Sequence, residues 1–301
     1  YEPNENQLWY FSFTTGFRAG GFALGVSGQR DDARDENGVP NGTGSVLVDY
    51  DEETVEAVEL GYKGLHLEDT LQIFASVYHY DYDGYQDELE QFDPIRGAGA
   101  NFVSNANGIT NRGFEIEMQY QANDRLNIAG NYSFTETEYG EDYLVLTVDD
   151  PLNPVAVFGQ CTQGYVSCDD DDPSFVTDYT VNLKGGPLKG IPETKFTLNL
   201  SYEMDSMWGP VWLFASYSYT GDFSASGVQR DLDRIESRET TNVSASWYSE
   251  DGSVNVRAYI RNLMDNDMYY ALSASSAEQN YRKTVSALDP RTMGIDIRYK
   301  F

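Results

Sequence analysis

The feature that most constrains the fold of this chain is an alternation with a period of two residues, which recurs in about ten segments. Phe196, Leu198 and Leu200, for example, alternate with Thr197 and Asn199. A period of two places such residues on opposite faces of a β-strand, whereas a helix repeats near 3.6 residues. The alternation therefore predicts an all-β, antiparallel protein. The segments are residues 7–17, 54–64, 69–84, 100–120, 125–138, 192–204, 211–223, 238–248, 253–263 and 290–301.

The connections between these segments alternate in length. In an antiparallel sheet, successive connections lie at opposite ends, so the short turns gather at one end and the long loops at the other. Outer-membrane barrels have this asymmetry, and several segments reach the roughly 9–11 residues that cross a bilayer at a tilt. No apolar run is long enough for a transmembrane helix. We therefore expect a transmembrane β-barrel wall of about ten strands in a Gram-negative outer membrane. The short turns are residues 65–68, 121–124, 205–210 and 249–252, and the long loops are 18–53, 85–99, 139–191, 224–237 and 264–289.

A soluble β-sandwich is the alternative that alternation leaves open, since its strands also have one apolar face. Arg257 and Arg261 both stand on the polar side of one segment, where a dry core would not accept them. We expect them to face an aqueous interior together with Arg298, Lys300, Glu115, Glu117 and Glu203. Tyrosines near strand ends suit a girdle at the lipid interface: Tyr78, Tyr80, Tyr82, Tyr85, Tyr217 and Tyr219.

Charge and composition exclude some functions. The formal net charge is -29 with a pI near 4.1. Nucleic-acid binding is therefore not expected, because phosphate recognition needs clustered Lys and Arg. The negative field also weighs modestly against small polyanions as ligands. Acidic residues concentrate in residues 31–36, 87–93 and 169–172, which we interpret as solvated loops. His66 and His79 are the only histidines, so an enzyme is not expected and no catalytic residue or cofactor is predicted.

The longest loop holds both cysteines and an acidic run. Cys161 and Cys168 are predicted to form a disulfide, since export compartments are oxidising; free thiols or a metal site are the alternatives. The carboxylates that follow are a hard-cation ligand set in principle; the alternatives are a simple solvated loop or a loop that divalent ions bridge to lipopolysaccharide phosphates. These carboxylates are Asp169, Asp170, Asp171 and Asp172. Candidates for contact with a ligand in the loops are Arg18, Tyr139, Tyr143, Phe158, Tyr165 and Phe175.

The last segment ends on an aromatic residue. Ile295, Ile297, Tyr299 and Phe301 share one face of it. This ending resembles the terminal strand by which outer-membrane barrels are recognised for assembly, so the barrel assembly machinery is an expected partner.

Several blocks, in order along the chain, resemble the carboxy-terminal part of the barrel of TonB-dependent receptors. They are residues 9–22 (WYFSFTTGFRAGGF), 53–63 (ETVEAVELGYK), 111–117 (NRGFEIE), 191–196 (IPETKF), 261–270 (RNLMDNDMYY) and 290–294 (PRTMG). The resemblance implies a barrel of about 22 strands around a globular plug, preceded by a segment, the TonB box, that contacts the TonB energy-coupling protein. Residues 1–301 would then form part of the wall, without plug domain or TonB box.

The function implied by this resemblance is energy-coupled uptake of a scarce ligand, most often a ferric siderophore. Expected partners are the TonB complex, outer-membrane lipids and lipopolysaccharide, and a small-molecule ligand. The alternatives are a stand-alone small barrel acting as a rim hydrolase, for which only His79 lies near the mouth, or as a passive porin.

Overall fold

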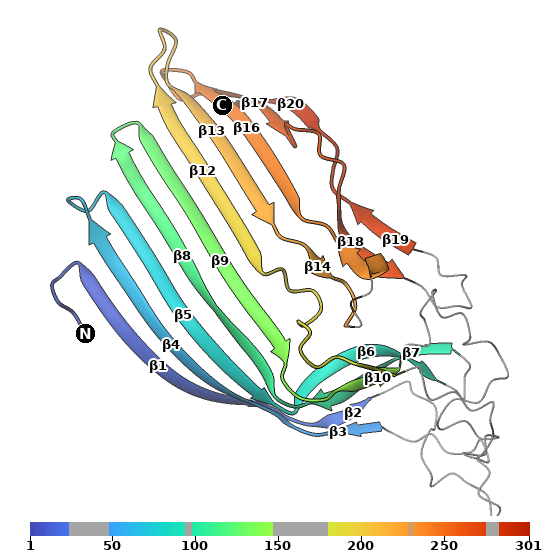
Figure 1. Cartoon of the computed structure of the whole chain (residues 1–301). Coiled ribbons are helices and arrows are strands. Elements are labelled where there is room, and N and C mark those ends of the chain that lie inside the picture. The colour runs from blue at the N-terminus through green and yellow to red at the C-terminus, as the bar shows by residue number, and fades with distance from the viewer. Residues whose placement is uncertain (24–47, 94–97, 147–179, 228, 230, 275–282) are drawn as a thin grey trace, which may run out of the picture.

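Ten long strands form one antiparallel sheet in which neighbours in the sequence are neighbours in space (Figure 1). A computed structural model describes residues 1–23, 48–93, 98–146, 180–227, 229, 231–274 and 283–301. The order across the sheet is β1 (Gln7–Arg18), β4 (Glu53–His66), β5 (Leu71–Asp83), β8 (Ile109–Asn123), β9 (Leu126–Tyr139), β12 (Thr194–Met204), β13 (Val211–Thr220), β16 (Arg238–Tyr248), β17 (Val254–Arg261) and β20 (Thr292–Tyr299). Each of the ten predicted segments contains one strand of this sheet, and the all-β, antiparallel fold class is confirmed.

Short turns join the strands at one end of the sheet, as predicted (Figure 1). In the β4–β5 turn, Leu67, Glu68 and Asp69 all have positive φ, between 52° and 67°. In the β16–β17 turn, Asp251 accepts hydrogen bonds from the hydroxyls of Ser249 (2.6 Å) and Ser253 (2.8 Å). These bonds lower the pKa of Asp251 to about 2, so the turn keeps its carboxylate acceptor throughout the physiological pH range.

Beyond the other end of the sheet the loops pair into small hairpins that the sequence reading did not predict. Predicted segment 100–120 is in fact two strands, separated near Gly108, whose φ is 65°. The hairpins are β2 (Gly21–Ala23) with β3 (Val48–Tyr50), β6 (Tyr85–Asp93) with β7 (Ala98–Ala106), β10 (Leu144–Leu146) with β11 (Thr180–Asn182), β14 (Phe223–Ser224) with β15 (Arg234–Ile235), and β18 (Tyr269–Ala274) with β19 (Lys283–Ala287). A single 3₁₀ turn, η2 (Asp231–Asp233), is the helical element of the described residues, and none of these residues belongs to a helix able to span a bilayer.

The register separates the sheet into an apolar face and a polar face. One apolar row runs from Phe11 through Leu60, Val77 and Phe114 to Phe134. In the adjacent polar row, Ser12, Glu59, Tyr78, Gly113 and Thr135 follow one another across the same five strands. Because successive residues of a strand point to opposite faces, this register gives every strand the same two-sided character.

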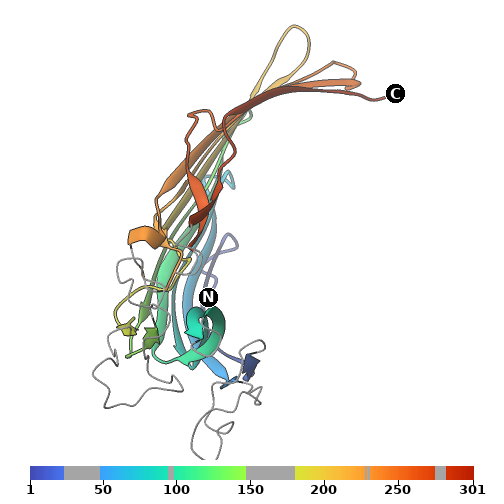
Figure 2. The same ribbon diagram turned by 90° about the vertical axis from the view of Figure 1, so that its right-hand side faces the viewer.

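The apolar face is open. Phe11 is 69% exposed, and Ile297 on β20 is 71% exposed. Figure 2 shows the described strands as one curved layer seen edge-on, with no second sheet packed on it. A sandwich would bury these rows, so the soluble alternative does not hold. A continuous apolar surface of this extent is compatible with a membrane and not with water.

Candidate ligand-facing surface and loop base

The polar face carries many of the charged side chains of the sheet, with acids in the majority on β4 and β8 and cations in the majority on β12 to β20. On β4 and β8 the charged residues of this face are Glu53, Glu59, Lys63, Glu115 and Glu117. On β12 to β20 they are Lys195, Glu203, Arg238, Arg257, Arg261, Asp296 and Arg298. The predicted common face of Arg257, Arg261, Arg298, Glu115, Glu117 and Glu203 is therefore confirmed. The sequence reading did not single out Lys195 and Arg238, although strand parity assigns both to this face.

Glycines on the polar face provide the room in which tyrosine rings lie flat against a neighbouring strand. A Cβ added at Gly113 would lie 2.7 Å from the hydroxyl of Tyr78, and one at Gly294 would lie 2.6 Å from that of Tyr259. Aromatic rings over glycine pin strand register in this way. Tyr78 also shares a 2.9 Å hydrogen bond with Thr135, two strands away. The polar face thus has a rigid aromatic floor.

The same register shows that four of the six tyrosines predicted to form an aromatic girdle do not lie on the apolar face. Tyr78, Tyr80 and Tyr82 pair with Glu59, Ala57 and Val55 on the polar face. On β5 the even-numbered tyrosines lie on one face, and the odd-numbered Ile73, Ala75 and Val77 lie on the other, apolar face. The tyrosines therefore cannot lie at a lipid interface. Tyr85 starts the β6 hairpin and is likewise not on the apolar face. Tyr217 and Tyr219 do lie on the apolar face, at its loop end.

A set of buried residues, here called the loop base, joins the long connections just beyond the sheet. Its apolar members are Ala106, Ile109, Tyr139, Tyr143, Leu183 and Leu188, with Tyr82, Tyr85 and Ile191 packed against them. Two amide side chains hold main chain to this base. The Nε2 of Gln86 donates to the carbonyls of Ala19 and Asp51, each at 3.0 Å, and the Nδ2 of Asn105 donates to Asp51 (3.0 Å) and Gly84 (2.6 Å). The amides thereby link the β1–β4 and β5–β8 connections.

A buried carboxylate links a third connection to the loop base. Asp87 is 3% exposed, accepts the hydroxyl of Tyr139 at 2.6 Å and lies 3.4 Å from the Nζ of Lys189. Its assignment to a solvated acidic loop is therefore wrong. The acidic composition of residues 87–93 suggested that Asp87 would remain hydrated. In the structure it is buried, and its contacts with the Tyr139 hydroxyl and the Lys189 cation compensate the loss of hydration.

The pKa shifts at the loop base follow from burial. Burial raises the pKa of Tyr143 to about 12, although a hydrogen bond with Ser104 opposes the shift. Burial, followed by the negative charges of Asp87 and Glu53, raises the pKa of Tyr85. Both phenols therefore remain neutral hydrogen-bonding groups at physiological pH.

Replacing Asp87 by asparagine should loosen the loop base. The change keeps an oxygen for the Tyr139 hydroxyl but removes the charge that faces Lys189. Since the Lys189 side chain is 32% exposed, we expect a loss of only about 1 kcal/mol. Thermal unfolding of the full gene product in detergent measures it. The control is Asp142→Asn, whose partner Lys184 is exposed; a control as strongly affected as Asp87→Asn would contradict the role assigned to the loop base.

The predicted ligand-contact residues have separate positions. Arg18 is the exposed last residue of β1 and lies at the loop end of the polar face. Tyr139 and Tyr143 are buried, with their rings stacked at 5.6 Å, so in this conformation they support the loops and offer no ring to a ligand. Outside the described residues lie Phe158, Tyr165, Phe175, the predicted disulfide Cys161–Cys168 and the candidate cation ligands Asp169, Asp170, Asp171 and Asp172.

Neither histidine has a constellation that suggests catalysis. His66 shares a 2.6 Å hydrogen bond with the hydroxyl of Tyr62 near a turn. His79 lies 3.1 Å from Asp81 and pairs in register with Val58 and Arg112, which places it on the outer, apolar side. His79 therefore does not lie on the polar face of the sheet.

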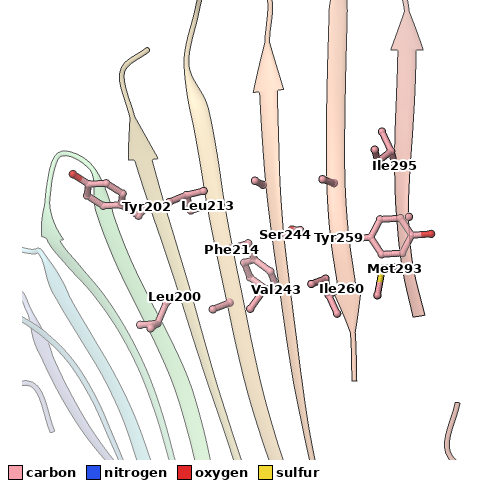
Figure 3. A pocket seen from close by; sticks show the side chains of 14 residues that line it. Leu200, Tyr202, Leu213, Phe214, Val243, Ser244, Tyr259, Ile260, Met293 and Ile295 are labelled. Carbon is pink, nitrogen blue, oxygen red and sulfur yellow. The ribbon is translucent and has the colours of Figure 1, made fainter. Parts of the chain in front are cut away.

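The apolar face contains a hollow of about 810 Å³ across β12 to β20 (Figure 3). Its lining includes the small side chains of Ala215, Ala245 and Ala258 as well as the larger ones of Leu213 and Ile295. It belongs to the apolar face and is separated by the sheet from the charged side chains, so it is not a candidate for a polar ligand.

The family model described as "TonB dependent receptor-like, beta-barrel" matches residues 1–263. No curated protein matches the chain significantly. Among solved structures, the whole chain superposes on 36% of the ferric yersiniabactin uptake receptor FyuA from Yersinia pestis, with 15% identity and a TM-score of 0.65. It also covers 35% of the siderophore receptor PiuA from Acinetobacter baumannii (15% identity, TM-score 0.62) and 34% of the ferric-catecholate import receptor Fiu from E. coli K12 (16% identity, TM-score 0.62). The chain thus spans about a third of the length of these structures.

Proposed function

This chain belongs to the TonB-dependent receptor β-barrel family of the Gram-negative outer membrane. We therefore propose that it forms part of the barrel wall of a receptor for energy-coupled uptake of a ferric siderophore. In this proposal residues 1–301 are the carboxy-terminal part of the barrel domain, and the plug domain and TonB box lie outside them. The polar face then lines the interior, and the loops beyond the loop base surround its outer mouth.

The observation that carries the proposal is the two-sided wall. An exposed apolar face backs a charged face, and the loop connections are anchored at one end only. Several similar structures are siderophore or ferric-chelate receptors by name. The matched family and these structures are transport receptors, not enzymes.

The partners follow from the same assignment. The apolar face would contact outer-membrane lipids, with lipopolysaccharide on the loop side, and the TonB complex would act through the part of the receptor outside residues 1–301. Ile295, Ile297 and Tyr299 form the exposed apolar row of β20, an edge strand of the described sheet, and the exposed Phe301 follows two residues after it. An exposed apolar row at an edge, followed by an aromatic residue, suits recognition by the barrel assembly machinery.

Uptake of iron-55 delivered as ferric siderophores is the direct test. Cells that carry the intact gene should accumulate the label, and cells without the gene, or with the energy supply of the inner membrane collapsed, should not. Accumulation that persists without that energy supply would instead favour a passive porin. Equal accumulation with and without the gene would remove ferric siderophores as the ligand.

A further inference from the structure

A cavity of about 350 Å³ lies at the loop end of the sheet, between two neighbouring connections. Residues 187–194, which lead into β12, form one wall of it, and residues 219–234, which lie between β13 and β16, form the other. Small-molecule sites in proteins measure about 300–1,000 Å³. The cavity is therefore large enough for a ligand of one or two rings.

Hydrogen bonds join the two walls of this cavity. The main-chain N–H of Gly190 donates to the carbonyl of Ser224 at 2.8 Å, and the Nε2 of Gln229 donates to the carbonyl of Pro187 at 2.6 Å. These bonds hold the connections against each other without any ligand between them. Because the cavity is preformed in this way, a ligand would not have to order its walls on binding.

The long strands contribute to this cavity from the side of the apolar face. Their residues in its lining are Thr194 on β12 and Tyr219 on β13. Even positions on β12 and odd positions on β13 are those of the apolar residues, so both residues lie on that side of the sheet. Lys195 and Arg238, the cations of the polar face at the same end, do not line the cavity. A plug domain on the polar side would therefore not account for it.

Hydrogen-bond acceptors and one strong donor stand side by side in the lining. The carboxylates of Glu193, Asp222 and Asp231 line the cavity together with the guanidinium group of Arg234. An oxygen of Asp222 lies 2.8 Å from an Nη of Arg234, and both side chains are exposed. Among the residues that the structure describes, the carboxylates of Glu193 and Asp231 have neither an ion-pair nor a hydrogen-bond partner. The lining thus offers several free acceptors and carries an excess of negative charge.

This combination of groups discriminates between classes of ligand. Phosphate, sulfate and carboxylate groups need donors, and the excess of carboxylates repels them. An ammonium group offers donors alone, and the Arg234 guanidinium repels it. A hydroxyl group both donates and accepts. Two neighbouring hydroxyls of one ring can therefore bond to the carboxylate of Asp222 and to the guanidinium of Arg234 at the same time.

We propose that this cavity is a binding site for an uncharged sugar unit, held by Asp222 and Arg234 through adjacent ring hydroxyls. Tyr219 and Phe223 supply aromatic rings to the lining. The C–H face of a sugar ring is apolar and packs against the flat body of such a side chain. The site is separate from the uptake of a ferric siderophore and takes a ligand of different chemistry.

Two sources present uncharged sugars at the loop end of the wall. Tyr219 lies at the loop end of the apolar face, beside the head groups of outer-leaflet glycolipids. Oligosaccharides in solution reach the same end from outside the cell. Both sources have the same ring chemistry, so the experiment must separate them.

The test is calorimetric titration of the full product of the gene, purified in detergent. The probes are neutral oligosaccharides of glucose, galactose and mannose, their sulfated forms, and the delipidated, dephosphorylated core oligosaccharide of lipopolysaccharide. The variant is Asp222→Ala/Arg234→Ala. The control is Asp142→Ala/Lys184→Ala, which removes another exposed ion pair of the loop connections, with its charged atoms 3.2 Å apart, and likewise leaves the net charge unchanged. Circular dichroism verifies that both fold.

We expect the parent to bind at least one neutral oligosaccharide and to reject its sulfated form. The Asp222/Arg234 variant should bind the neutral form at least about tenfold more weakly, because it loses two hydrogen bonds to charged groups. The control should bind like the parent. A second variant, Glu193→Gln/Asp231→Asn, keeps hydrogen-bonding groups but removes negative charge, and it should admit the sulfated form.

The sugar site is refuted if the parent binds no neutral oligosaccharide, if it binds the sulfated forms as well as the neutral ones, or if the Asp222/Arg234 variant binds like the parent. Binding of the core oligosaccharide alone supports the site and identifies the glycolipid as the source. Binding of the other neutral oligosaccharides without the core supports it and identifies a soluble ligand. Iron-55 uptake is measured separately, so its failure would contradict siderophore transport and leave the sugar site standing.

Discussion

Leu213→Arg should destabilise the wall by about 1–2 kcal/mol, less than the penalty of about 2–4 kcal/mol for a cation on the lipid side at mid-membrane, because Leu213 is the third residue of β13 and lies toward its turn end. Leu213 lies on the apolar face, level with Tyr202, Ala245 and Ala258. Arginine there would place a charge among acyl chains with no carboxylate beside it. Denaturant unfolding of the full gene product in phospholipid vesicles, followed by tryptophan fluorescence, measures the loss.

Ser216→Arg is the matched control for this experiment. Ser216 lies on the same strand but on the polar face, between Asn199 and Asn242. The same side chain should be tolerated there, because water is available to it. Equal destabilisation by the two variants would mean that the faces have been assigned wrongly, and with them the membrane orientation of the whole wall.

Gly113→Ala should cost about 3 kcal/mol, at the upper end of the range for overpacked sites. The added Cβ would lie 2.1 Å from the main-chain oxygen of Phe134 and 2.7 Å from the hydroxyl of Tyr78. A backbone oxygen cannot rotate away as a side chain can, so β8 and β9 would have to separate. The same unfolding measurement applies.

Gly16→Ala provides the comparison for Gly113→Ala. Its Cβ would lie 3.1 Å from the Cγ1 of Val55, the end of a side chain that can move. We expect little change. A Gly113 variant as stable as the Gly16 variant would show that the strands adjust freely and that the seating of Tyr78 does not fix the register.

The sheet was predictable because the face on which a strand residue lies depends only on whether its position is odd or even, which the local sequence shows directly. Ten alternating segments were enough to identify ten strands and their two faces, including the positions of Arg257 and Arg261. The prediction that Tyr78 and its neighbours on β5 belong to an aromatic girdle was wrong because it considered the residue type and ignored whether each position is odd or even. The same parity would have added Lys195 and Arg238 to the polar face.

The loop base could not be predicted, because its contacts join residues that no local pattern relates. Asp87 and Lys189 are far apart in the sequence, and Gln86 recognises carbonyl groups, which every residue has. In the sequence Asp87 resembles part of a solvated acidic loop, and only its contacts with Tyr139 and Lys189 account for its burial.

The way in which Gln86 and Asn105 hold the loops affects how the protein can change over evolutionary time. Their amides bind the main chain of Ala19, Asp51 and Gly84, so the anchoring does not depend on which side chains those positions carry. Mutations can accumulate in the connecting segments while the hydrogen bonds persist. Such a scaffold permits rapid diversification of exposed loops, whether the selective pressure is a new nutrient, a phage or a bacteriocin, while the barrel beneath them is conserved.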